Sequence, residues 1–203
     1  SVAIGYWVYE KTGSSALMGI MSSISMFMTM FVMPFSGSII DKCSRKLIIV
    51  GMDALRGVIM LALGILAFAD SLSVPVVLAA AFLASACSVF FSPAVSTLML
   101  DIIPHDDMVR GQSVFSGVNS FINLVGKAVS GALVALLGVP LIILLNGVSY
   151  LISAFTELFI TVPETAHQGE KITLRGIFSD FGVAIREVFR NRYLRLFIPS
   201  ALI

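Results

Sequence analysis

Charged residues are scarce in this sequence. Asp, Glu, Lys and Arg make up 12% of its 203 residues, whereas hydrophobic residues make up 58%. So low a charge content excludes a soluble domain of this length. The formal net charge of +1 leaves no basic face of the size that nucleic-acid binding requires, so we expect no nucleic-acid partner. The composition instead indicates a protein whose surroundings are lipid.

Residues for disulfides, metal sites and familiar catalysis are also few. Cys43 and Cys87 fall on a loop and inside an apolar run, which predicts neither a disulfide framework nor a zinc site. His105 and His167 lie far apart on predicted loops, where solvated side chains are the rule. The sequence has no P-loop, HExxH or G-x-S-x-G motif. We therefore expect no enzyme, no catalytic residue, no metal and no cofactor.

Long apolar runs are what the sequence has in abundance. A bilayer-spanning helix needs about 20 residues. Five runs reach that length: 16–40, 47–69, 75–100, 113–137 and 141–162. Residues 1–9 resemble the tail of an earlier span with interfacial aromatic residues, and residues 195–203 resemble the start of a later one. We interpret residues 1–162 as a transmembrane bundle whose first helix is incomplete, within a larger protein.

A polar stretch follows the last complete span. Residues 163–194 combine a polar linker with a segment that has apolar residues on one helical face and arginines on the other. This pattern predicts an amphipathic helix along the inner leaflet of the membrane. Its simplest role is to join two halves of the protein, and binding of a cytosolic partner is the alternative.

Lysines and arginines are distributed unequally between the loops. The loops 41–46 and 101–112 and the segment after 163 hold three, one and six of them, whereas the opposite loops hold Lys11 alone. Cytoplasmic loops carry the excess of Lys and Arg. The loops 41–46, 101–112 and 163–194 are therefore predicted to be cytoplasmic, in a multi-pass protein of the cell membrane.

The loop at 41–46 carries an ordered pattern that topology alone does not require. Glycine lets helices approach closely, an acid can pair with nearby donors, and basic side chains can bond to carbonyls at a helix end. We interpret the pattern as a conformational latch formed by Gly37, Asp41, Lys42, Arg45 and Lys46, followed inside the next helix by Asp53 and Arg56.

These residues resemble the signature G-x-x-x-D-[RK]-x-x-[RK]-[RK] of the major facilitator superfamily, between its second and third transmembrane helices. The resemblance extends over the whole chain in helix spacing. The stretches LIIVGMDALRG and FFSPAVSTLMLDIIPHDDMVRGQSVFSGVNSF resemble the drug-exporter branch, which includes macrolide and siderophore efflux proteins. Val95 stands where relatives often carry Arg, and Lys127 and Ser130 replace Pro and Gly of the fifth-helix motif.

The resemblance implies twelve helices in two six-helix halves, each with inverted three-helix repeats. The chain is then an all-α membrane protein, the N-terminal half of this fold together with the start of helix 7. The latch would lock the cytoplasmic ends of the two halves together while the site faces outward. Its partner would be the C-terminal half of the same chain, and we expect a monomer.

Polar residues recur along one side of the fifth span, beside a face of small residues. A lysine at this depth costs about 3 kcal/mol unless it faces a wet cavity or snorkels outward, and both readings stay open. We predict a substrate cavity lined by Asn119, Asn123 and Lys127, with Ser92, Ser96, Asn146 and Tyr150. We predict helix packing at Gly117, Gly126 and Gly131.

Glu157 in the sixth span is a second ionisable group at membrane depth. It shares a helical face with Asn146, Ser149, Tyr150 and Ser153. Proton coupling and snorkelling to the interface are both consistent with this position. The span 75–100 contains no arginine of the kind that many proton antiporters of the superfamily carry there.

The most economical hypothesis is a secondary active transporter that exports drug-like or amphipathic small molecules by alternating access, with proton coupling. Such a protein would be an antiporter of the multidrug or macrolide resistance type. Uptake of a small polar or anionic solute on the same fold is one alternative, and it explains Lys127 better. A membrane receptor or scaffold that moves nothing is the alternative from another class.

Overall fold

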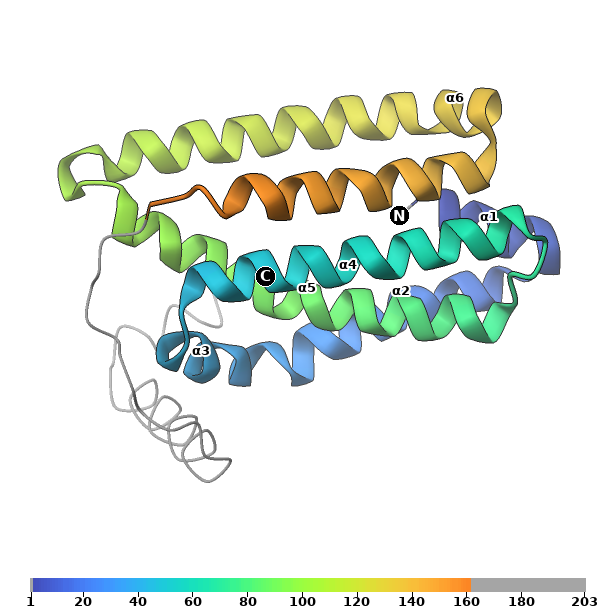
Figure 1. Cartoon of the computed structure of the whole chain (residues 1–203), viewed down its shortest axis with the longest axis horizontal. Coiled ribbons are helices and arrows are strands. Elements are labelled where there is room, and N and C mark those ends of the chain that lie inside the picture. The colour runs from blue at the N-terminus through green and yellow to red at the C-terminus, as the bar shows by residue number, and fades with distance from the viewer. Residues whose placement is uncertain (1, 162–203) are drawn as a thin grey trace, which may run out of the picture.

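A computed structural model describes residues 2–161 of the chain. These residues form a bundle of helices that run along its long axis, and they contain no strand (Figure 1). The order of elements is α1 (Val2–Thr12), α2 (Ser15–Phe31), α3 (Met33–Lys42), α4 (Arg45–Phe68), α5 (Val74–Ile102), the short 3₁₀ helix η1 (His105–Asp107) and α6 (Met108–Glu157). The predicted linker 163–194 and the start of helix 7 lie outside the described residues.

The lengths of the helices match a membrane. Within the described part, α4, α5 and α6 are long and apolar enough to span a bilayer, and α2 with α3 adds a fourth bent candidate. The 50 residues of α6 would measure about 75 Å as one rod, more than twice the ~30 Å hydrocarbon core. Gly138, with φ of 75°, folds α6 back on itself just before Pro140, so α6 is two antiparallel spans (Figure 1).

One expected span is broken in the middle. The run 16–40 forms α2 and α3, which meet at Val32 with a bend of 55°. Pro34 has no backbone N–H for the preceding turn, and it sits in the first turn of α3, where that loss is tolerated. The bend lets α3 pack against the end of α5.

The tightest packing joins α4 to α6 and depends on glycines. A Cβ built on Gly57 would lie 2.5 Å from Leu151, and one on Gly64 would lie 2.6 Å from Leu144. A Cβ on Gly147 would lie 2.8 Å from the backbone nitrogen of Leu61. These two helices therefore approach at backbone distance, as small residues permit in membranes.

The glycines that the sequence analysis selected for packing have a different setting. Among the described residues, no atom lies within 4 Å of a Cβ built on Gly37, Gly117, Gly126 or Gly131. Close helix contact at these positions stays a prediction, which concerns parts of the protein beyond residues 2–161.

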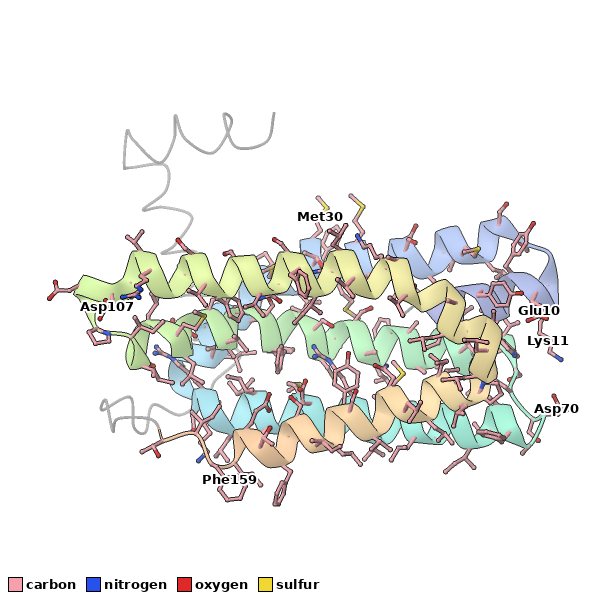
Figure 2. All side chains as sticks on the ribbon, turned by 90° about the horizontal axis from the view of Figure 1, so that it is seen from above. Glu10, Lys11, Met30, Asp70, Asp107 and Phe159 are labelled. Carbon is pink, nitrogen blue, oxygen red and sulfur yellow. The ribbon has the colours of Figure 1, made fainter. Side chains whose placement is uncertain are left out.

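The two ends of the bundle differ in charge. Figure 2 shows Asp107 and Phe159 at one end and Glu10, Lys11 and Asp70 at the other. The first end also holds α3, the start of α4 and the end of α5 (Figure 1), and with them Lys42, Arg45, Lys46 and Arg110. We call these the Arg45 end and the Glu10 end. Three helix ends thus meet at one place with four of the five loop cations that the described part of the chain contains.

Candidate functional site

The first polar centre lies at the Arg45 end, where three helices meet at one arginine. Arg45 is the first residue of α4, Asp41 lies in the last turn of α3, and Asp101 is near the end of α5. Nη1 of Arg45 donates to Oδ2 of Asp101, and Nη2 lies 3.7 Å from Oδ1 of Asp41. The side chains of Arg45 and Asp101 are 15% and 17% exposed, whereas that of Asp41 is 68% exposed. We call this arrangement the Arg45 clasp.

The second polar centre is buried inside the bundle. Nη1 of Arg56 donates to Oδ1 of Asp53 at 3.0 Å, within α4. Asp53 is 2% exposed and Arg56 is 7% exposed. The guanidinium of Arg56 also lies 4.7 Å from the ring centroid of Phe91 and 5.6 Å from that of Tyr150. A cation between two aromatic rings gains electrostatic stabilisation where water is scarce.

A third ionisable group completes the buried centre. Ser153 donates to Oε1 of Glu157 at 3.1 Å, and its hydroxyl also lies beside the Asp53 carboxyl. Glu157 is close enough to interact electrostatically with both Asp53 and Arg56. Its Oε2 is buried and has no hydrogen-bond partner among the described residues. We call Asp53, Arg56 and Glu157 the Arg56 cluster: two carboxyls share one guanidinium.

A cavity of about 600 Å³ adjoins the Arg56 cluster. Five helices contribute to its wall, with Ile4 from α1, Met21 from α2, Arg56 from α4, Ser88 from α5 and Tyr150 from the second span of α6. Arg56 is the one charged side chain among its described lining residues. The volume falls within the range of small-molecule sites in proteins.

The structure brings only part of the predicted cavity together. Asn146 and Tyr150 line the cavity, but Ser92 and Ser96 do not and are exposed on α5. Asn119, Asn123 and Lys127 lie on α6, where every residue from 112 to 129 is exposed. Within the described part, this stretch of α6 therefore faces outward, and a role for it in binding stays a prediction.

The predicted latch residues separate into two groups. Asp41 and Arg45 are joined in the clasp. Lys42 and Lys46 are next to them in the sequence, at the end of α3 and the start of α4, and are half-buried. Asp53 and Arg56 belong to the Arg56 cluster instead, which lies about 12 to 17 Å further along α4 at 1.5 Å per residue.

Some functional residues escaped the sequence reasoning. Asp101 belongs to the segment that resembles the drug-exporter branch, but the sequence does not indicate its bond to Arg45, because 56 residues separate the two. Ser153 and Phe91 were likewise not connected to Arg56. The sequence contains one signal for the clasp. Asp101 is an acid directly after the apolar run 75–100, and this run is expected to end on the same side of the membrane as the loop 41–46.

In the described part of the chain, no group of three or more His, Cys, Asp or Glu side chains is arranged to hold a metal ion. Cys43 and Cys87 are free thiols there, with Cys43 partly exposed and Cys87 buried.

Comparison with known proteins decides the family. The family model described as "Major Facilitator Superfamily" matches residues 1–203. The chain belongs to the major facilitator superfamily. The helical half-bundle described above is what this superfamily membership requires, and the predicted fold class is confirmed.

Three curated relatives within the superfamily carry informative names. A putative bacilysin exporter, BacE, of Bacillus subtilis is 30% identical over 166 residues, which is 81% of this chain and 40% of the relative. Macrolide efflux protein A of Streptococcus pyogenes is 24% identical over 163 residues, 80% of this chain and 40% of the relative. The uncharacterized transporter YkuC of Bacillus subtilis is 24% identical over 172 residues, 82% of this chain and 40% of the relative.

The chain spans about 40% of the length of the curated relatives it matches. No solved structure matches it. The superfamily is a family of transporters, and the described part of the chain has helices long and apolar enough to span a membrane.

Proposed function

We propose that the chain is the N-terminal half of a secondary active transporter that exports drug-like or amphipathic small molecules by alternating access. Superfamily membership supports transport, and the names of two relatives, a bacilysin exporter and a macrolide efflux protein, support export. Alternating access as the mechanism, and amphipathic small molecules as the substrates, are what we propose for this chain.

The Arg45 clasp is the observation that carries the proposal. It ties the ends of three helices together through one guanidinium that is neither fully buried nor free in water. Partly solvated ion pairs are worth little enough to break and re-form reversibly, as a switching element must. The clasp thus has the properties of a latch that holds one mouth of the transporter closed.

We place the Arg45 end in the cytoplasm. Lys42, Arg45, Lys46 and Arg110 lie at this end, whereas the Glu10 end carries Lys11 with the acids Glu10 and Asp70. Positively charged loops are retained on the cytoplasmic side. On this orientation the latch closes the inner mouth when the site faces outward.

The Arg56 cluster is our candidate for proton coupling through Glu157. Two carboxyls face one guanidinium, and Arg56 is bonded to Asp53. An ionised carboxyl without its own cation is costly at membrane depth, and an arriving proton removes that cost. Gain and loss of a proton at Glu157 would therefore change the energy of helix packing between α4 and α6.

Transport in inside-out vesicles tests the proposal. Vesicles from cells that express the full-length protein are energised to acidify their interior, and uptake of the amphipathic dye ethidium is recorded. A panel of neutral and anionic amphipathic probes is recorded beside ethidium. For at least one probe we expect uptake that collapses when nigericin dissipates the proton gradient, and that is lost in Asp101→Asn. Uptake that persists without any ion gradient would remove the coupling, and no uptake of any probe in the panel would contradict export.

Uptake of a small anionic solute is the second candidate, because the charged side chain in the cavity wall is the cation Arg56. Right-side-out vesicles with the same protein separate the two directions. Accumulation of an anionic probe in these vesicles, with none in inside-out vesicles, would favour uptake over export.

A further inference from the structure

We infer that the cavity beside Arg56 is a binding site for a small amphipathic carboxylate, whose anionic group pairs with the guanidinium of Arg56. The inference rests on the proposed function only in treating this ligand as a transported substrate. The cavity is lined by the helices of one half of the transporter, and includes Arg56 and Met60 from α4 and Asn146 and Tyr150 from α6.

Arg56 is incompletely hydrogen-bonded beside this cavity. Its Nη1 donates to Asp53, and its Nε is buried and has no hydrogen-bond partner among the described residues. A buried cation with an unmet donor is costly, so an anion that reaches the guanidinium from the cavity gains binding energy there. Guanidinium and carboxylate match in shape and charge, which makes a carboxylate the favoured acceptor.

Most serine hydroxyls of the cavity already donate within the protein. Ser22 donates to the carbonyl of Met18 at 3.1 Å, and Ser88 donates to the carbonyl of Ala84 at 3.0 Å. Ser25 and Ser85 bond to each other at 2.9 Å, so one of the two hydroxyls is also engaged as a donor. Arg56 is the one charged donor among the described lining residues, and a charged donor binds a carboxylate more strongly than a neutral hydroxyl or amide.

The charge around the cavity favours an anion over a cation. Asp53 and Glu157 do not line the cavity, whereas Arg56 does. The negative charge of the cluster therefore lies behind the guanidinium as seen from the cavity. The rest of the wall holds methionines, among them Met18, Met21 and Met60, whose flexible thioethers adapt to apolar bodies of varied shape.

Lys127 is the competing anion site. It lies on the exposed stretch of α6 and outside this cavity. A surface lysine is a hydrated point charge, whereas a buried guanidinium between aromatic rings is already desolvated and fixed in direction. The geometry therefore assigns carboxylate selection to Arg56, and the two cations give a matched pair of variants.

Equilibrium binding of two probes to the full-length protein in nanodiscs tests the inference. Radiolabelled 2-naphthoate and 2-naphthamide have the same ring system and differ in the charge of the polar group. We expect naphthoate to bind at least about tenfold more tightly than naphthamide. Asp53→Asn/Arg56→Gln, which removes both charges of the ion pair, should bring this ratio to about one. Lys127→Gln should leave the ratio unchanged.

A fourth variant keeps the test independent of the buried charges. Ala84→Phe fills the cavity from α5, so it should weaken both probes about tenfold. Equal affinities in the wild-type protein, a ratio that survives the double variant, a ratio lost in Lys127→Gln, or unchanged binding in Ala84→Phe would each overturn the inference. If naphthoate binds preferentially through Arg56 but no transport occurs in vesicles, the proposed function would be refuted and the binding site would be retained.

Discussion

Two arginines on one helix show how burial alone separates two roles. Arg45 and Arg56 both lie on α4, and each faces two carboxyls. Arg45 receives its acids from α3 and α5 at an end of the bundle that water reaches. Arg56 has one acid on its own helix and one on α6, and it is covered by the rings of Phe91 and Tyr150.

The difference teaches what each centre can do. Water and salt compete for the Arg45 clasp, so its bonds can be exchanged at low cost. The Arg56 cluster is buried, so its ion pair is costly to break and any unmet hydrogen bond has a large effect. The first centre suits a reversible latch, and the second suits ligand and proton recognition.

The largest expected effect on the free energy of unfolding comes from removing one partner of the buried Asp53–Arg56 pair. Arg56→Gln leaves Asp53 buried without its cation, which we expect to cost about 3–5 kcal/mol of unfolding free energy. The double variant Asp53→Asn/Arg56→Gln should recover most of this loss. Unfolding by SDS in mixed micelles gives both values. If the double variant were no more stable than the single one, the pair would not be desolvated as described.

A smaller effect is expected at the clasp, and its two acids should differ. Asp101→Asn removes a charge-assisted bond between mostly buried groups, for which we expect about 1.5–3 kcal/mol. Asp41→Asn should change stability by less than about 0.5 kcal/mol, because Asp41 is largely exposed and more distant from Arg45. The same unfolding assay checks both. Equal losses at Asp41 and Asp101 would mean that burial does not rank the two bonds.

The cysteines report the accessibility of the two regions. Cys43 follows α3 beside the clasp and is partly exposed, whereas Cys87 on α5 is 3% exposed. We expect a membrane-impermeant maleimide to label Cys43 at least about tenfold faster than Cys87, and only in inside-out vesicles. Mass spectrometry of the labelled peptides measures both rates. Labelling of Cys43 in right-side-out vesicles would reverse the proposed orientation.

The smallest expected effect is a difference in salt dependence between the Arg45 clasp and the Arg56 cluster. Raising NaCl from 0.1 to 1 M shortens the screening length from about 10 Å to about 3 Å. The stability lost in Asp101→Asn should then shrink by about 0.5 kcal/mol, while the loss in Arg56→Gln should stay the same. SDS unfolding at the two salt concentrations gives this comparison. A salt-dependent loss at Arg56 would show that water reaches the cluster.

Much of the fold could be predicted because a bilayer imposes one length on every span. The apolar runs indicated an all-helical half of a major facilitator protein, and that fold class is confirmed. The break of α6 at Gly138 falls between the expected runs 113–137 and 141–162, whereas the angle of the bend at Val32 was not predicted. Hydropathy measures the length of a run, whereas a 55° bend depends on how α3 packs against α5.

The polar centres were predictable only where they are local in sequence. Asp53 and Arg56 are three residues apart, so helical periodicity alone suggested their pairing. The bond from Arg45 to Asp101 and the approach of Glu157 to Arg56 depend on tertiary packing of separate helices. The glycines at 57, 64 and 147 escaped notice for the same reason, because a close approach requires knowledge of the facing helix.

The most direct test of the account is the opening of the Arg45 end when the clasp is broken. In inside-out vesicles with the full-length protein and Cys43 as the sole cysteine, the rate of maleimide labelling reports access to this end. The account predicts labelling several times faster in Asp101→Asn than in the wild-type protein, with no change in Asp53→Asn/Arg56→Gln. Equal rates in the wild-type protein and in Asp101→Asn would contradict a latch at Arg45.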